Sequence, residues 1–147
     1  MHLTIISVGH KMPAWVTIAT HDYIKRMPAD CSIAIKELKP ALNSAKDAIH
    51  FEAAIPKGAH VIALDERGQD ISTQDLANHL AKWRQAGINI AFIIGGADGL
   101  DPKLKSQANA LWKLSSLTLP HAFVRVLLSE QLYRAWTILQ GHPYHRE

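Results

Sequence analysis

Cysteine is nearly absent from this chain: Cys31 is the single one among 147 residues. One cysteine excludes an internal disulfide and a cysteine-based metal site. Long apolar runs are missing too, because none approaches the roughly 18 residues that span a bilayer. The opening run Met1–Val8 resembles a strand and lacks the basic region and cleavage site of a secretory leader. We therefore expect a cytoplasmic protein without a membrane segment.

Several common catalytic and binding motifs are also missing. There is no H-E-x-x-H, no G-x-S-x-G and no paired-carboxylate arrangement, so metallopeptidases, serine hydrolases and glycosidases have no support. A P-loop is absent, and Gly9 after the first predicted strand lacks the partners of a dinucleotide fingerprint. The histidines at 2, 10, 21, 50, 60 and 79 lack ligand spacing, and we expect no metal site.

The composition is that of an ordinary folded protein, with 48% hydrophobic and 20% charged residues. A length of 147 residues predicts one domain over 1–147, large enough to bury its own core. The net charge is +3 and the pI is near 9.1. This mild basicity permits binding to nucleic-acid phosphates but equally fits a solvated surface.

Apolar patterning predicts strands that alternate with helices. We expect strands at 3–8, 33–38, 60–64 and 88–94 and a short strand-like segment at 112–119, with helices at about 13–27, 42–54, 72–87, from 101 onward, and at 122–139. The run 88–94 is almost entirely apolar, as in a strand buried on both faces. The alternation predicts an α/β fold with a mostly parallel sheet and helices on both faces.

Local signals support three of these helices. Ser72 and Asp75 have the spacing of a capping box, followed by Leu76, Leu80 and Trp83 on one face. In the first predicted helix, residues at four-residue spacing share a face: Trp15, Ala19, Tyr23 and Met27. The last predicted helix carries the strongest apolar stripe: Phe123, Leu127, Leu128, Leu132, Ala135, Trp136 and Leu139.

The stretch Phe92–Leu100 is the first candidate site, because a buried strand leads directly into Gly95 and Gly96. Two residues without Cβ let a ligand approach the backbone closely, as at the strand ends of parallel sheets. The same pair also fits a tight turn between a strand and a helix.

Two further polar segments lie near the C-terminus. His121 and Arg125 share the first turns of the last predicted helix, where free N–H groups and the guanidinium suit an anion; a surface cap is the alternative. Tyr144, His145 and Arg146 could stack on a base and bind a phosphate, or form a frayed end. Because these three residues lie outside every predicted core element, their deletion is expected to cost little stability.

These residues, taken together, resemble the RlmH family of the SPOUT superfamily, bacterial methyltransferases of a pseudouridine in 23S ribosomal RNA. The resemblance runs from Met1 to Glu147 and rests on the order and spacing of the following segments: Val8-Gly9, Lys11, Tyr23, Leu64-Asp65, Ile94-Gly95-Gly96, Gly99-Leu100, 115–121, Arg125-Val126, 130–135 and 144–146. Two departures concern peripheral rRNA contacts: the connector 39–57 is shorter and less basic than is typical, and Gln69 replaces a common lysine.

The resemblance implies a homodimer with a deep C-terminal trefoil knot that binds S-adenosylmethionine. Carried onto this chain, the cofactor contacts are Leu64, Gly95, Gly96, Leu114, Ser115, Ser116, Leu117, Thr118 and Leu119. The polar residues around the target nucleotide are His121, Arg125, Tyr144, His145 and Arg146.

The implied reaction is methylation of N3 of a pseudouridine in the helix 69 stem-loop of 23S rRNA, within the assembled ribosome or in free rRNA. Arg125 or Arg146 would stabilise the imide anion, and His121 or His145 would take the proton. Two alternatives remain: another rRNA or tRNA nucleotide as target, or a catalytically silent RNA-binding protein. Retention of both the cofactor segments and the tail argues against the silent protein.

Overall fold

The computed structural model describes residues 1–9 and 11–146. Five strands, five α-helices and two 3₁₀ turns occur in these residues: β1 (His2–Val8), α1 (Ala14–Ile24), η1 (Ala29–Cys31), β2 (Ser32–Leu38), α2 (Ser44–Ala54), β3 (His60–Asp70), α3 (Thr73–Ala86), β4 (Ile90–Ile94), α4 (Pro102–Gln107), β5 (Ala110–Lys113), α5 (His121–Gln140) and η2 (Pro143–Arg146). His10, one of the isolated histidines, and Glu147, the last residue of the predicted domain, lie outside the described residues.

The strands form one parallel sheet in the order β2-β1-β4-β3-β5. β4 lies at its centre and is buried over its whole length, from Ile90 to Ile94. Strand side chains alternate between the two faces, so each face builds its own core. The predicted mostly parallel α/β sheet is confirmed.

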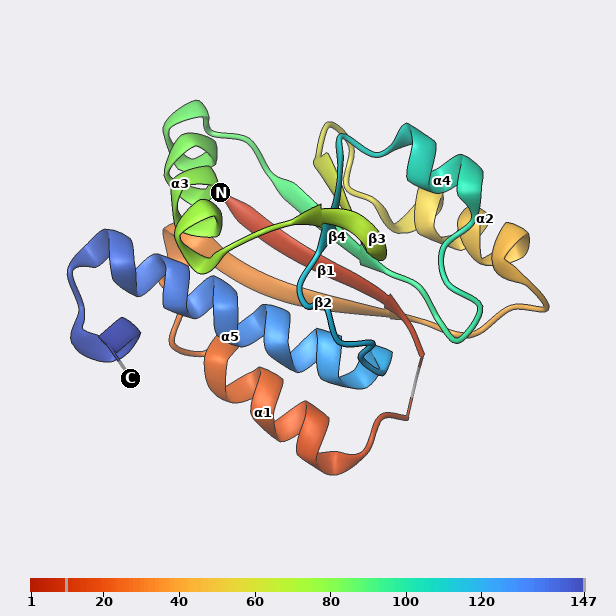
Figure 1. The fold of residues 1–147 in the computed structure, drawn as a ribbon, viewed down its shortest axis with the longest axis horizontal. Coiled ribbons are helices and arrows are strands. Elements are labelled where there is room, and N and C mark those ends of the chain that lie inside the picture. Colours follow the sequence, from red (N-terminus) through yellow and green to blue (C-terminus); the bar gives the residue numbers. More distant parts are fainter. Residues whose placement is uncertain (10, 147) are drawn as a thin grey trace.

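Helices cover both faces, as predicted (Figure 1). On one face, Ile5, Phe92 and Ile62 pack with side chains of α3 and α5, including Leu80 and Leu132. On the other face, the alternate positions Ile6, Ala63, Ala91 and Ile93 pack with Phe51 of α2 and Leu104 of α4. In Figure 1, α5 runs beside α1, and η2 lies at the end of α5 farthest from the loop that follows β5.

The predicted helix boundaries agree closely with the structure. The side chain of Ser72 accepts from the Asp75 amide while the Asp75 carboxylate accepts from the Ser72 amide, so the capping box is confirmed. Gly87 ends α3 in the left-handed conformation, with φ of 68°. The amide of Ile88 still bonds to the last turn of α3, at Trp83 O. For this reason β4 starts at Ile90 instead of 88.

Two expectations about apolar faces were wrong. In α1 the buried positions are Val16 and Thr20, while Trp15 is 46% exposed. Phe123, assigned to the buried stripe of the last helix, is 51% exposed. The two exposed rings contact each other with centroids 5.1 Å apart, so they form an apolar surface patch across α1 and α5.

The predicted strand at 112–119 is mostly wrong, because β5 ends at Lys113. Beyond it, Ser115 Oγ accepts from the Leu117 amide at 2.9 Å, which turns the chain out of the sheet. Conversely, β3 extends to Asp70, six residues beyond the prediction, with a register shift between Leu64 and Gln69. Both ends of this long strand pair with β5.

Candidate functional site: a cavity at the strand ends

A cavity of about 560 Å³ opens where β4 and β5 end, beside the middle of β3. Its size is within the range of small-molecule sites, and its place is the usual one for ligands in parallel sheets. Its wall comprises the strand ends Ile94 and Lys113, residues 64–67 at the register shift within β3, the turn 95–100, Leu114, Ser115, Leu117, Thr118, Leu119, His121 and Val124, together with Ser44, Pro102 and Lys105. Eight of the nine predicted cofactor residues are in this wall; Ser116 is not.

The turn after β4 depends on its glycines for reasons of packing. A Cβ at Gly95 would lie 2.6 Å from the backbone carbon of Gly99. The turn is closed by a hydrogen bond from the Gly99 amide to Gly96 O at 3.0 Å, and Gly99 has φ of +74°. A side chain at position 95 therefore collides with the turn itself. This confirms that Gly95 is needed for a tight turn after β4, the alternative that the sequence offered. The turn nevertheless forms one wall of the cavity.

The opposite wall is the irregular segment 114–119, which faces residues 65–67 of β3. Thr118 Oγ1 donates to Glu66 Oε2 at 3.4 Å, linking the two. Gly68, the next residue of β3, approaches β5 closely, because a Cβ there would lie 2.5 Å from Trp112 C. This wall consists of leucines with Ser115 and Thr118, a mostly apolar lining that suits a flat ligand.

A charged pair in the cavity wall was missed by the sequence reasoning. Lys105 Nζ lies 3.2 Å from Asp65 Oδ2, and the two side chains are 24% and 13% exposed. Asp65 Oδ1 also accepts from the Arg67 amide at 2.8 Å, a local bond at the register shift of β3. The two residues are 40 positions apart, so no local spacing could have indicated the pair.

His121 and Arg125 lie at the start of α5, as predicted, but in different settings. His121 lines the cavity. Its Nε2 lies 3.3 Å from the position that a Cβ on Gly9 would take. Arg125 is 3% exposed, and its guanidinium donates to Glu37 Oε2 at 2.9 Å and to Gly9 O at 3.3 Å. Arg125 is thus a buried, paired cation, and its anchor Glu37 was not identified from the sequence.

The C-terminal tail packs against α5 and does not fray. The Tyr144 ring meets Tyr133 edge-on, with centroids 4.7 Å apart, and the Arg134 guanidinium lies 5.1 Å from its centroid. Tyr144 OH donates to Glu130 Oε1 at 3.3 Å, and Arg134 Nη1 donates to the carbonyl of His145 at 3.4 Å. The frayed-end alternative is therefore wrong, and from these contacts we now expect removal of the tail to cost stability.

The protonation state of Tyr144 follows from this packing. Burial, together with hydrogen bonding and the nearby Glu130 carboxylate, raises the pKa of Tyr144 well above the usual phenol value. The phenol therefore keeps its proton and acts as a donor, which excludes it as a base. His145 is half-buried and Arg146 is exposed.

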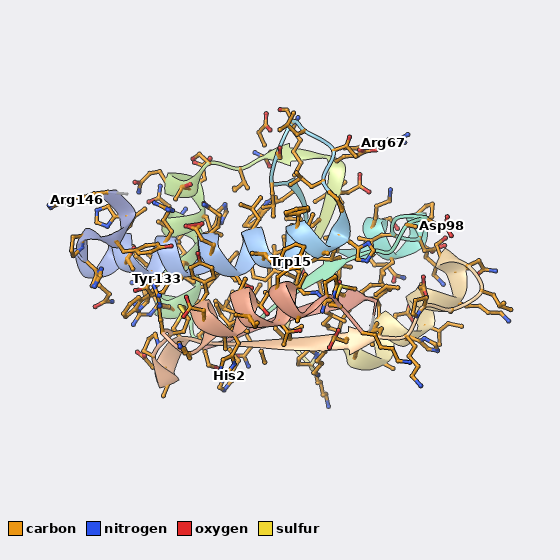
Figure 2. All side chains as sticks on the ribbon, turned by 90° about the horizontal axis from the view of Figure 1, so that it is seen from below. His2, Trp15, Arg67, Asp98, Tyr133 and Arg146 are labelled. Atoms are coloured by element: carbon orange, nitrogen blue, oxygen red, sulfur yellow. The ribbon has the colours of Figure 1, made fainter. Side chains whose placement is uncertain are left out.

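Within one chain the tail and the cavity are far apart. α5 has 20 residues between them, a length of about 30 Å at 1.5 Å per residue. Figure 2 shows Arg146 of the tail and Asp98 of the cavity wall at opposite ends of the molecule, with Trp15 between them. The structure thus brings together His121 and eight of the nine predicted cofactor residues, but not Tyr144, His145 and Arg146.

None of the helices in the described residues is long and apolar enough to cross a bilayer. Nor do His, Cys, Asp or Glu side chains gather into a group that could hold a metal ion anywhere in residues 1–9 and 11–146.

Known structures share this fold at low sequence identity. A methylase family protein from Haemophilus influenzae superposes with a TM-score of 0.64 and 14% identity, over 97% of this chain and 69% of the other. One from Neisseria gonorrhoeae gives 0.58 and 16%, over 89% and 81%.

Sequence relatives are much closer. The ribosomal RNA large subunit methyltransferase H of Polynucleobacter asymbioticus is 74% identical over 147 residues, which is 100% of both chains. Its counterpart in Paraburkholderia xenovorans is 55% identical, with 99% of both chains covered. Residues 1–145 match the family described as "Predicted SPOUT methyltransferase". The chain therefore belongs to the SPOUT methyltransferases and, among them, to the ribosomal RNA large subunit methyltransferase H family.

Proposed function

We propose that this protein transfers the methyl group of S-adenosylmethionine to N3 of a pseudouridine in the helix 69 stem-loop of 23S rRNA, within the assembled ribosome. The observation that carries the proposal is the cavity at the ends of β4 and β5 beside the middle of β3, whose wall contains eight of the nine predicted cofactor residues. The full-length relatives bear the name ribosomal RNA large subunit methyltransferase H.

The residues of the cavity fit S-adenosylmethionine. Leu64, Ile94, Leu114 and Leu119 offer apolar surface for an adenine ring, and the Asp65–Lys105 pair places both signs of charge beside it. A zwitterionic amino-acid group and two ribose hydroxyls require that kind of mixed lining. When bound, the sulfonium compound supplies an electrophilic methyl group, so the protein mainly has to orient the reactants and handle one proton.

The residues of the chain divide these tasks. His121 lines the cavity and accepts the N3 proton of the target. Arg146 is an exposed cation and stabilises the imide anion that forms. Arg125 is 3% exposed and paired with Glu37, so it supports the structure of the site from the protein interior. Tyr144 stays protonated and donates a hydrogen bond.

The tail must then come from a second copy of the chain. Its separation from the cavity along α5 prevents it from reaching the cavity of its own subunit. A homodimer in which α5 and α1 of two copies pack antiparallel would place each tail beside the partner's cavity. The exposed rings of Trp15 and Phe123, with Ile18 at 69% exposure, provide an apolar patch on those two helices.

A trefoil knot is part of the proposal. In it, the chain after β5 passes behind the segment 65–72, which is the second half of β3 and its connection to α3, before α5 begins. This is supported by the pairing of β5 with both halves of β3 and by the close approach of Gly68 to the Trp112 backbone.

Mixed dimers test the composite site directly. One variant carries Gly95→Val in the cavity wall, and the other lacks residues 144–147. When each variant is assayed without the other, it is expected to be inactive on ribosomes. After unfolding and refolding together, half of the dimers contain one intact cavity beside one intact tail. Activity should return to about a quarter of that of the unmutated protein.

Methylation is measured with radiolabelled S-adenosylmethionine on ribosomes, and the modified nucleotide is mapped by mass spectrometry of the rRNA. If mixing restores nothing while mixed dimers form, each tail serves its own subunit and the arrangement is wrong. If the unmutated protein leaves N3 of pseudouridine unmodified, the assigned reaction is wrong.

A further inference from the structure

Arg125 holds a positive charge in an almost solvent-free place. Its side chain is 3% exposed, and the carboxylate paired with it is that of Glu37, 2.9 Å away and 44% exposed. A buried guanidinium without a counter-charge is strongly unfavourable, so Arg125 needs this carboxylate to stay where it is.

The bonds of Arg125 fix the orientation of its guanidinium. Nη1 donates to Glu37 Oε2, and Nη2 donates to the carbonyl oxygen of Gly9 at 3.3 Å. Nε is buried and has no hydrogen-bond partner in the described part of the chain. Because the guanidinium is a rigid planar fork, two directional bonds define its plane.

The end of β1 is in turn held against the cavity. Gly9 has φ of +128°, and its amide donates to Leu38 O at 2.8 Å, beside Glu37 on β2. His121, one helical turn before Arg125, packs its Nε2 over Gly9 and lines the cavity. A chain of contacts thus runs from Glu37 through Arg125 and Gly9 to His121, while Glu37 itself lies outside the cavity wall.

We infer that Glu37 is a positioning residue for methyl transfer, which acts through Arg125 to hold Gly9 and His121 in place; the inference rests on the proposed function. Without the carboxylate, the guanidinium loses its counter-charge and turns toward water. Gly9 then loses its bond to Nη2, and the imidazole of His121 loses the surface on which it packs. The residues that would hold S-adenosylmethionine, among them Leu64, Gly95 and Leu119, are untouched by this change.

The test compares Glu37→Gln with a matched control, Glu52→Gln, on the exposed side of α2. Glutamine keeps the shape of the side chain and removes its charge. Glu37→Gln should lower kcat on ribosomes by on the order of tenfold to a hundredfold, because small displacements of reacting groups have effects of this size. The Kd for S-adenosylmethionine in calorimetry should stay within about twofold, and the control should match the unmutated protein. An unchanged kcat in Glu37→Gln overturns the inference.

A double-mutant cycle separates an action through Arg125 from a general loss of structure. If Glu37 acts through Arg125, adding Glu37→Gln to Arg125→Gln should change kcat by less than about twofold. Multiplication of the two single effects would show that Glu37 acts by another route and would overturn the inference. Glu37→Gln alone could fold poorly, because it leaves the charge of Arg125 buried without a partner. The double variant carries neither charge, so its comparison with Arg125→Gln is informative in that case too.

A third measurement does not depend on activity. The Nε–H resonance of Arg125 in NMR should shift and exchange faster with solvent in Glu37→Gln, but not in Glu52→Gln. An unchanged resonance overturns the inference whatever the kinetics show. If the unmutated protein fails to methylate ribosomes while the resonance responds as expected, the proposed reaction is wrong and the link from Glu37 to Arg125 stands.

Discussion

Replacing Gly95 by alanine is expected to displace the turn that lines the cavity. The added Cβ would lie 2.6 Å from Gly99 C, 2.8 Å from Gly99 O and 2.9 Å from Leu100 N. Carbon atoms in contact prefer about 3.5–4.0 Å, so the two backbone segments must separate by about 1 Å. All three opposing atoms belong to the backbone, and no side-chain rotation can relieve the clash.

The loss of stability and of affinity in Gly95→Ala can be estimated from the residues that the turn keeps in place. Overpacking of this kind typically costs about 1–3 kcal/mol, and Leu100, which is 5% exposed, would be pulled from the core on the α2 and α4 face. If the displaced turn lowers the binding free energy of S-adenosylmethionine by 1.4 kcal/mol, the affinity falls about tenfold. We therefore expect at least about a tenfold loss of affinity for S-adenosylmethionine.

Two neighbouring glycines serve as controls. A Cβ at Gly96 would lie 3.1 Å from Val8 Cγ1, a side-chain atom that can move, so Gly96→Ala should cost less than about 1 kcal/mol. A Cβ at Gly99 meets open space, but its φ of +74° is strained for alanine and should cost roughly 1–2 kcal/mol.

Urea unfolding followed by circular dichroism gives the stabilities, and calorimetry with S-adenosylmethionine gives the affinities. The reasoning fails if Gly95→Ala equals the unmutated protein in both measurements. It also fails if Gly96→Ala loses as much affinity as Gly95→Ala, because the clash with Gly99 would then not be the cause.

Three further predictions concern other parts of the molecule. Tyr144→Ala should lower the free energy of unfolding by about 1–2 kcal/mol, because it removes one aromatic pair and one hydrogen bond. Urea unfolding measures this loss, and Tyr144→Phe should lose only the contribution of the hydrogen bond. If neither variant loses stability, the tail does not stabilise the protein by packing on α5. Trp15→Glu, with Trp15→Phe as its control, should convert the proposed dimer into monomers in sedimentation at micromolar concentration; a dimeric Trp15→Glu protein would place the interface elsewhere. His79 packs on Trp83 and Trp112, and this burial, with a smaller effect of Lys82, lowers its pKa below 6.5. At a pH just below 6.5 the unfolded chain therefore binds more protons at this histidine than the folded protein does. The free energy of unfolding is then unaffected by His79 above pH 6.5 and falls as the pH drops below 6.5. Urea unfolding at pH 5.5 and 7.5 should show a smaller pH dependence for His79→Phe than for the unmutated protein, and equal dependence would refute this assignment.

The sequence determined by itself those features that depend on near neighbours in the chain. The capping box of Ser72 and Asp75, the stop at Gly87 and the buried run of β4 are all within one element or its ends. Alternation of strands and helices was sufficient to predict the parallel sheet, since hydrophobic faces of both kinds must be covered. Local patterns also indicated Gly95-Gly96, the His121–Arg125 segment and the tail as candidate sites. The family resemblance, which depends on order and spacing over the whole chain, added Leu64 and the segment 114–119 and assigned the cofactor and target roles.

Only the tertiary structure decided which of these residues meet. Trp15 and Phe123 have the helical spacing of core positions, yet packing with the sheet left them at the surface. The pairs Asp65–Lys105 and Glu37–Arg125 join residues 40 and 88 positions apart, a separation that no local periodicity encodes. The length of α5 likewise separates the tail from the cavity of its own chain. Patterns along a sequence record which face of an element is apolar, whereas contacts between elements depend on how all of them pack at once.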